Sequence, residues 1–375
     1  MSANGGGLSL TAYTKHTFDL RENWKGLEGN QVKSTVFYDI DDFRYEEREI
    51  PQIGETEVLI KMKACGLCGT DIHKAVEKTV PTPTVLGHEV AGEVVRTGSK
   101  VTGFKPGDRV FVAHHVPCFT CHHCQRGHYS LCPQFTRTNL DPGGFSEFIR
   151  VPELHVKHTM GKIPDSLSYE QGAMVEPVAC CLHGFDALDM QSGDSVLIMG
   201  AGQIGCIHAQ IARHRMAGTV IVSDVNDYRL AKAKELAADT VINAARENVV
   251  ERVRELTGGR GADKVIISAG VGALLPQAME CAARGGTVLV FAPFHEEPVP
   301  IPAHRFFADE IRVVGTYSST PYDYLPALEL LKNGVIDVEA MVTHRFPLAR
   351  LHEAIMCAHN PREEVLKVII TPEEV

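Results

Sequence analysis

From about residue 177 onward, short apolar segments alternate with stretches long enough to form helices. Apolar runs of this length are typical of strands buried on both faces, and helix-length connections join strands that run parallel. Six such runs are present, at 195–199, 220–224, 241–243, 264–270, 287–292 and 311–316. The alternation predicts an α/β domain over 177–316, built on a doubly wound parallel sheet.

A glycine-rich turn follows the first of these strands directly. It consists of Gly200, Ala201, Gly202, Gln203, Ile204 and Gly205. In a G-x-G-x-x-G turn between a strand and a helix, the first glycine allows the tight turn, the second lets the backbone approach a pyrophosphate, and the third allows close helix packing. The phosphates then lie at the positive N-terminus of the helix. These residues are predicted to bind a dinucleotide; the alternative is a glycine-rich turn closed by a capping aspartate.

The choice of dinucleotide depends on the end of the second strand. Asp224 stands there, nineteen residues after Gly205, where a carboxylate accepts hydrogen bonds from a ribose 2′-hydroxyl and repels a 2′-phosphate. Arg229, five residues further on, could reach such a phosphate if the loop moved. Asp224 therefore predicts NAD rather than NADP, with Arg229 at the edge of the same site.

Four closely spaced cysteines follow the pattern C-x2-C-x2-C-x7-C. They are Cys118, Cys121, Cys124 and Cys132. Four thiolates close a tetrahedral zinc shell with no open position, which is the ligand set of a structural zinc. The alternatives are unliganded buried thiols and an iron–sulfur cluster, which with this start would have three residues before the last cysteine. We therefore expect a structural zinc lobe at about 114–133. The histidines of the loop, His122, His123 and His128, are expected to be solvated.

The N-terminal half of the chain has a different pattern of apolar and polar residues. Residues 1–30 show no sustained period of a strand or a helix, and we expect them to form an extension. From Val32 to Val110, short alternating segments separated by Gly, Pro and Asp predict an antiparallel β domain. A length of 375 residues, with 44% hydrophobic and 22% charged residues, fits a globular protein of at least two domains.

Charge and hydropathy narrow the classes of partner. The net charge is −10 and no extended Lys/Arg cluster occurs, so nucleic acid is not expected to bind. No apolar run approaches the ~20 residues of a membrane span, and residues 1–30 lack the pattern of a signal peptide. Eleven cysteines and 18 histidines then favour metal binding in a reducing compartment. We expect a cytoplasmic protein with a small-molecule substrate.

A second group of potential metal ligands precedes the four-cysteine loop. Cys68 follows Cys65 in a C-x2-C pair, and His88 and Glu89 stand about twenty residues further on. A catalytic zinc needs about three protein ligands and an open position, and Cys68 with His88 supply a thiolate and an imidazole. Taken singly, Cys65 is more often a core thiol and Glu89 more often a solvated carboxylate.

Five segments then make the chain recognisable. They are CGLCGTDIH at 65–73, GHEVAGEVVRTGSKV at 87–101, FKPGDRV at 104–110, MVEPVAC at 174–180 and GAGQIG at 200–205. With the four-cysteine lobe, in this order, they resemble the zinc-containing medium-chain dehydrogenases of the alcohol dehydrogenase superfamily from about Val32 to Val375. The resemblance implies a GroES-like β-rich catalytic domain over 31–176, a Rossmann NAD-binding domain over 177–316, and a return to the catalytic domain over 317–375.

Within this superfamily, Glu176 stands where the alcohol dehydrogenases proper have a cysteine ligand. This departure resembles the polyol (sorbitol or L-iditol) and the threonine dehydrogenase branches. It implies that Cys68, His88 and either Glu89 or Glu176 hold a catalytic zinc, with a water in the open position.

The resemblance also assigns a proton relay. Thr70 matches the hydroxyl residue that begins the relay, and His73 matches the histidine that passes the proton to solvent. Tyr317 and Ser318, after the last predicted strand, resemble the polyol pattern more than the threonine pattern.

The expected function is oxidation of a secondary alcohol of a sugar alcohol or cyclic polyol to a ketone, with hydride transfer to NAD and two zinc ions per chain. Threonine would need a cationic partner for its carboxylate, and Arg137 is the one plausible candidate near the expected cleft. L-threonine 3-dehydrogenase is the alternative within the class, and a non-catalytic NAD-binding protein is the alternative outside it. We also expect a homo-oligomer, a dimer or a tetramer.

Overall fold

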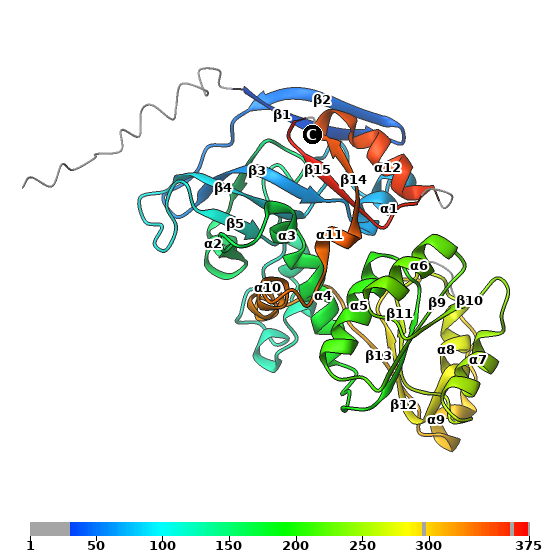
Figure 1. Ribbon diagram of the computed structural model, residues 1–375. Coiled ribbons are helices and arrows are strands. Elements are labelled where there is room, and N and C mark those ends of the chain that lie inside the picture. The colour runs from blue at the N-terminus through cyan, green and yellow to red at the C-terminus, as the bar shows by residue number, and fades with distance from the viewer. Residues whose placement is uncertain (1–30, 295–297, 361–363, 374–375) are drawn as a thin grey trace, which may run out of the picture.

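The computed structural model of the chain describes residues 31–294, 298–360 and 364–373, so the predicted extension at 1–30 lies outside the described residues. One half of the molecule is β-rich and combines the blue and cyan N-terminal elements with the red C-terminal elements, whereas the other half is a layered α/β domain (Figure 1). The expected fold class, a GroES-like domain joined to a Rossmann domain, is confirmed.

The β-rich domain is built mainly from antiparallel strands. Its N-terminal strands are β1 (Gln31–Asp39), β2 (Asp42–Glu49), β3 (Val58–Gly66), β4 (Glu89–Thr97), β5 (Arg109–Val112), β6 (Phe148–Val151) and β7 (Met160–Lys162). Its short helices and 3-10 turns in this part are α1 (Gly69–Glu77), η2 (Cys124–Arg126), η3 (Tyr129–Leu131), η4 (Phe135–Arg137), α2 (Glu153–His158) and α3 (Tyr169–Ala173). The strands β1 and β2 pair with each other in a separate hairpin, and β4 pairs antiparallel with both β3 and β5.

The end of the chain returns to this domain. Its elements are α11 (Val338–Met341), β14 (Val342–Pro347), η5 (Leu348–Arg350), α12 (Leu351–His359) and β15 (Lys367–Thr371). The strand β15 pairs antiparallel with β3 and parallel with β14, which gives the strand order β14-β15-β3-β4-β5-β7. The sheet is therefore mixed. Its parallel pair, β14 and β15, comes from the segment that returns from the other domain. The alternating pattern up to Val110 could predict only the antiparallel strands.

The α/β domain has the six predicted parallel strands. They are β8 (Ser195–Met199), β9 (Thr219–Asp224), β10 (Thr240–Asn243), β11 (Ala262–Ile267), β12 (Ala282–Val290) and β13 (Arg312–Gly315). The helices between them are α5 (Gln203–His214), α6 (Asp227–Leu236), α7 (Val249–Leu256), α8 (Leu274–Cys281) and α9 (His304–Ala308). In the strand order β10-β9-β8-β11-β12-β13, the chain adds β9 and β10 on one side of β8 and then β11, β12 and β13 on the other. Ligands of such sheets bind beyond the carboxyl ends of the strands, at the point where the chain changes sides.

Local sequence explains these elements well. Every residue of β8 is buried, as expected for a strand covered by helices on both faces. Asn226 and Asn248 cap α6 and α7, since their side chains accept hydrogen bonds from backbone N–H groups in the first turn. The helix α10 (Tyr324–Lys332) stops just before Gly334, whose φ of +67° suits glycine.

One helix contacts both domains. The helix α4 (Val175–Asp186) packs against α10 and α5, and it lies between the two halves in Figure 1. It runs without a break through the predicted boundary between 176 and 177. Glu176 therefore stands in the first turn of a helix that contacts both domains.

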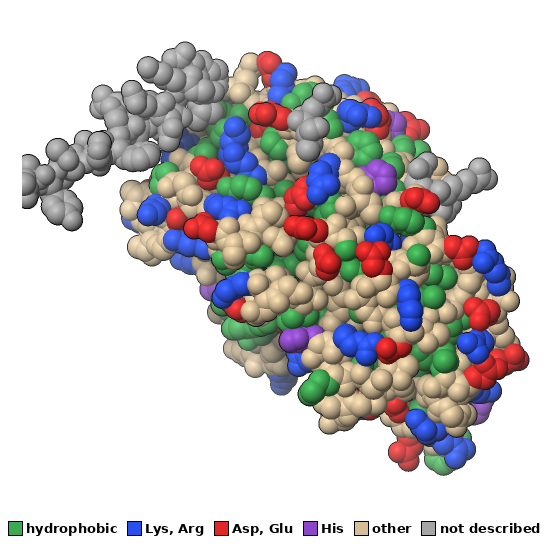
Figure 2. All heavy atoms as spheres, in the orientation of Figure 1, with side chains coloured by type: hydrophobic (Ala, Val, Ile, Leu, Met, Phe, Trp, Pro, Cys, Tyr) green, Lys and Arg blue, Asp and Glu red, His purple; other side chains and the backbone are tan. Residues whose placement is uncertain are grey.

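On the side of the molecule that Figure 2 shows, basic and acidic side chains are interspersed over both domains, so neither sign of charge dominates this face. Among the described residues, none of the helices combines the length and the apolar character needed to cross a membrane.

Candidate functional site

The ends of two paired strands bring the first predicted ligand group together. Gly66 at the end of β3 pairs with Glu89 at the start of β4, so Cys68, just after β3, lies close to His88 and Glu89. One ligand atom from each of these three residues lies within 4.8 Å of the other two. His88 and Glu89 are 6% and 1% exposed, and a thiol, an imidazole and a carboxylate form a donor set that suits zinc.

A buried aspartate orients the histidine of this group. Asp71 Oδ1 lies 3.3 Å from His88 Nδ1, and Asp71 also accepts hydrogen bonds from the backbone N–H groups of Gly87 and Cys68. His88 therefore has Nε2 left for a metal, the arrangement usual for metal-binding histidines. Burial alone would raise the pKa of Asp71, but the facing charge of His88 holds that pKa below its usual value. Sequence reasoning missed Asp71, although an acidic residue three positions after Cys68 was a usable signal.

A buried ion pair holds the carboxylate of Glu89. The Nζ atom of Lys367, from β15, donates to Glu89 Oε2 and to the backbone oxygen of Leu67, 3.2 Å away. The side chains of Lys367 and Glu89 are 0% and 1% exposed. Gly66 makes room for the pair, because a Cβ atom at that position would lie 1.8 Å from Glu89 Oε2. Sequence reasoning missed Lys367 too; its signal is a lysine inside the apolar run VLKVII.

Glu176 lies near this group without being part of it. The residue is 8% exposed, and burial raises the pKa of its carboxyl to about 7. The Cys180 thiol, one helical turn further along α4, donates to Glu176 Oε1 at 3.4 Å. Of the two carboxylates that sequence reasoning left open as the third ligand, the structure groups Glu89 with Cys68 and His88, and leaves Glu176 outside the 4.8 Å group.

The residues of the predicted relay share one face of α1. Thr70 is exposed at the start of the helix, and His73 is half-buried one turn later, a spacing that makes them neighbours. His73 Nδ1 lies 3.3 Å from Glu77 Oε1. The relay itself stays a prediction.

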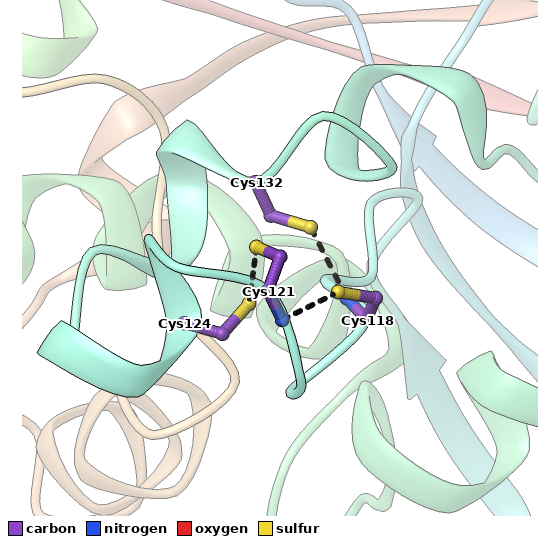
Figure 3. A group of neighbouring side chains, drawn as sticks. All are labelled: Cys118, Cys121, Cys124 and Cys132. Carbon is purple, nitrogen blue, oxygen red and sulfur yellow. Dashed lines mark hydrogen bonds between the residues drawn. The ribbon is translucent and has the colours of Figure 1, made fainter.

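The four cysteines of the lobe converge, as Figure 3 shows. Their sulfur atoms all lie within 4.8 Å of one another. Backbone N–H groups of the lobe point at two of them: Cys121 N donates to Cys118 Sγ at 3.3 Å, and Cys118 N donates to Cys132 Sγ at 3.2 Å. Such N–H···S bonds support thiolates in a metal site. In contrast, His122 and His128 are exposed, and His122 contacts Arg126 instead.

The glycine turn has the geometry that its motif requires. Gly200 has a φ of +109°, which favours glycine. A Cβ atom on Gly205 would lie 1.8 Å from the Gly200 backbone oxygen, whereas one on Gly202 would meet nothing within 4 Å. The third glycine thus allows α5 to approach β8, and the space above the second is open to a ligand. Gln203 and Ile204 form the first turn of α5 behind it.

Asp224 stands at the rim of this turn, at the end of β9. Its carboxylate accepts hydrogen bonds from Ala201 N at 2.7 Å and Asn226 N at 2.9 Å, which orient it and leave each oxygen further acceptor capacity. The buried Nε atom of Arg229 has no hydrogen-bond partner among the described residues. Val225 and Val271, after the carboxyl ends of β9 and β11, are 67% and 47% exposed.

The segment after β13 lies beside η4, in which Phe135 stands. Tyr317 is half exposed and its ring centroid lies 6.3 Å from that of Phe135. Ser318 has a φ of +56°, an uncommon conformation for a residue other than glycine. Ser319 donates to Tyr324 at 3.0 Å in the buried layer below. Arg137 is exposed two residues after Phe135, so the alternative anion partner lies at the edge of this region.

Comparison with known proteins places these features in one family. Residues 54–165 match the family model described as "Alcohol dehydrogenase GroES-like domain", and residues 204–333 match "Zinc-binding dehydrogenase". A sorbitol dehydrogenase from Bacillus subtilis is 34% identical over 91% of this chain and 97% of its own length. An L-threonine 3-dehydrogenase from Anaeromyxobacter dehalogenans is 34% identical over 80% of this chain and 87% of its own length.

A solved structure agrees with this assignment. A putative zinc-binding dehydrogenase from Sinorhizobium meliloti, bound to NADP, is similar with a TM-score of 0.85 and 31% identity, over 92% of this chain and 100% of that one. Both family models, both curated relatives and the paired domains point to the same class of enzyme. The chain belongs to the zinc-containing medium-chain dehydrogenases of the alcohol dehydrogenase superfamily.

Proposed function

We propose that this dehydrogenase oxidises a secondary alcohol of a sugar alcohol or cyclic polyol to a ketone and transfers the hydride to NAD. The observation that carries the proposal is the group of half-buried Cys68 with buried His88 and Glu89, whose donor atoms converge within 4.8 Å. A non-catalytic NAD-binding protein would have no use for such a group. The similarity to a sorbitol dehydrogenase along nearly the whole chain supports the substrate class.

Zinc at this group would polarise the substrate oxygen and lower the pKa of the hydroxyl. Residues of the chain would orient the metal ligands and transfer the proton. Asp71 fixes the ring of His88, and Lys367 fixes one oxygen of Glu89. Thr70 would accept the hydroxyl proton and His73 would deliver it to solvent, along the exposed face of α1.

For the third ligand we propose Glu89, since its donor atom already lies beside those of Cys68 and His88. Lys367 occupies Oε2 and leaves Oε1 for the metal. Glu176 would then act as a nearby carboxylate, held by Cys180, that can bind a water or a substrate hydroxyl. In the lobe, we assign Cys118, Cys121, Cys124 and Cys132 to a second, structural zinc.

The substrate class has a direct test. We expect kcat/KM for at least one of sorbitol, L-iditol, xylitol, ribitol and inositol to exceed that for L-threonine by more than tenfold, because hydroxyl groups of a polyol need no counter-charge. Initial rates of NADH formation measure this. If L-threonine were preferred by more than tenfold, the polyol assignment would be wrong, and the activity of Arg137→Ala would show whether that exposed arginine binds the carboxylate.

The cofactor preference has a separate test. We expect NAD to be preferred over NADP by at least tenfold, about 1.4 kcal/mol, because Asp224 at the rim of the glycine turn would repel a 2′-phosphate. The Asp224→Ser variant should narrow this ratio, and Asp227→Ser, at an exposed carboxylate in the next turn, serves as the control. The ratio of kcat/KM for the two cofactors is the measurement, and a wild-type preference for NADP would contradict the role of Asp224.

We also assign the protein to the cytoplasm and to a homo-oligomer. None of the described cysteines is part of a disulfide, which fits a reducing compartment. The strand β13 is at one edge of its sheet, and Phe307, in the helix just before it, is 93% exposed. An open edge beside an exposed aromatic side chain favours contact with a second copy. Light scattering should give the molar mass of a dimer or a tetramer for the wild type. The Phe307→Glu variant should shift the molar mass toward that of the monomer. A monomeric wild type would contradict the proposed homo-oligomer.

A further inference from the structure

A pair of histidines lies beside the proposed metal group. His114 and His115 follow β5 after one intervening residue, Ala113. The ring centroid of His114 lies 4.5 Å from that of His88 and 3.7 Å from that of His115. The His115 ring continues the row toward Phe135, 4.9 Å away. His114 is therefore the side chain of this row that touches a proposed metal ligand.

The backbone around His114 is held in place on every side. Each residue of the segment 113–116 makes a hydrogen bond to a residue distant in sequence. Ala113 exchanges two bonds with Thr159, His155 Nε2 donates to His114 O, His115 Nδ1 donates to Thr138 O, and Val116 N donates to Thr138 Oγ1. The ring of His114 is consequently presented to His88 from a rigid support, which is the property expected of a binding residue.

The hydrogen-bonding capacity of His114 is not used by the fold. His115 and His155 each donate a hydrogen bond from one ring nitrogen to a backbone oxygen, at 3.0 Å and 2.9 Å. The buried Nδ1 atom of His114 has no partner among the described residues, although the side chain as a whole is only half-buried. Unpaired buried polar atoms are rare, because each one costs the desolvation of the group. A partner from outside the chain would remove that cost.

We propose that His114 binds the hydroxyl group next to the carbon that is oxidised, so that the site selects vicinal diols over simple secondary alcohols. The inference rests on the proposed function, since the reacting oxygen must bind at the metal group of which His88 is part. A neutral imidazole has one donor and one acceptor nitrogen, as has the hydroxyl of an alcohol. A ring in contact with His88 can reach the substituent beside the reacting carbon.

The test compares butane-2,3-diol with butan-2-ol, which differ in the second hydroxyl alone. In the holoenzyme, His114→Phe keeps an aromatic ring against His88 and removes both nitrogens. We expect the ratio of kcat/KM for the diol to that for the mono-alcohol to fall by about ten- to hundredfold, since a site built for a hydroxyl loses its partner. His114→Asn, which keeps a donor and an acceptor, should retain most of the ratio. His158→Phe, an exposed histidine against Phe119, is the matched control and should leave the ratio unchanged.

A binding measurement separates this inference from the proposed function. Calorimetric titration of butane-2,3-diol into the NADH-loaded holoenzyme, where no oxidation can occur, should show weaker binding in His114→Phe at an unchanged zinc content. An unchanged diol ratio in a folded His114→Phe protein, or an equal loss for both alcohols, would overturn the assignment. If His114→Phe did not fold, a His114→Asn variant with no diol preference would overturn it, and a retained preference would support it. Wild-type protein that oxidises neither polyols nor diols, yet binds the diol through His114, would refute the proposed function alone.

Discussion

Replacing Lys367 by methionine is expected to lower the free energy of unfolding by about 3–5 kcal/mol, because it leaves Glu89 Oε2, the carboxylate oxygen that is not proposed to bind the metal, buried without its partner. The ammonium and the carboxylate are 0% and 1% exposed, so water cannot take the place of the missing charge. Activity should fall with stability, since Lys367 holds the oxygen of Glu89 beside the proposed metal ligands. Urea denaturation and kcat/KM for the best polyol measure the two effects.

Three further variants show whether the loss of stability comes from the unpaired charge. In Lys367→Met combined with Glu89→Gln, the buried charge is gone, and we expect the stability to recover in part. Lys157→Met, which removes an exposed ion pair with Glu153 in α2, should change stability little. Gly66→Ala should resemble Lys367→Met, because its Cβ atom would lie 1.8 Å from Glu89 Oε2. If Lys367→Met were as stable as Lys157→Met, the buried pair would not be needed.

The second large effect separates the two proposed zinc sites. Cys68→Ser should reduce zinc from two ions per chain to one and lower kcat/KM at least about a thousandfold, because the open site supplies Lewis-acid chemistry. Its melting temperature should stay close to that of the wild type. Cys121→Ser should also lose one zinc, but its main effect should be a fall in melting temperature of about 10 °C or more, since metal binding in a closed site is folding energy.

Elemental analysis, thermal melts and initial rates distinguish these outcomes. Cys357→Ser, in α12 and outside both ligand groups, is the matched control and should keep two zinc ions, full activity and the same melting temperature. Equal loss of activity in Cys68→Ser and Cys121→Ser, with no loss of stability in either, would show that the structural and catalytic roles are assigned wrongly. One zinc per wild-type chain, or stoichiometric iron, would contradict the two-site proposal.

Short spacings were enough to predict several features of this protein. The six strands of the α/β domain, the glycine turn and the fold class were predicted correctly, because each leaves a pattern in residues that are close together in the sequence. The glycines illustrate this: Gly200 and Gly205 face each other within one turn. The four lobe cysteines likewise span only fifteen residues, so that their convergence needs no long-range packing. The family followed from the order of such local motifs.

Only the tertiary structure decided which distant residues meet at the site. Lys367 reaches Glu89 across a separation of 278 residues, because β15 inserts beside β3 after the chain has left and re-entered the domain. The grouping of Glu89 rather than Glu176 with Cys68 depends on the register of β3 and β4 and on the position of α4 between the domains. The ring of His114 lies against His88 because distant threonines and a histidine clamp its backbone. Local spacing cannot encode such contacts, since they arise from strand register and from packing between segments that the sequence separates by long connections.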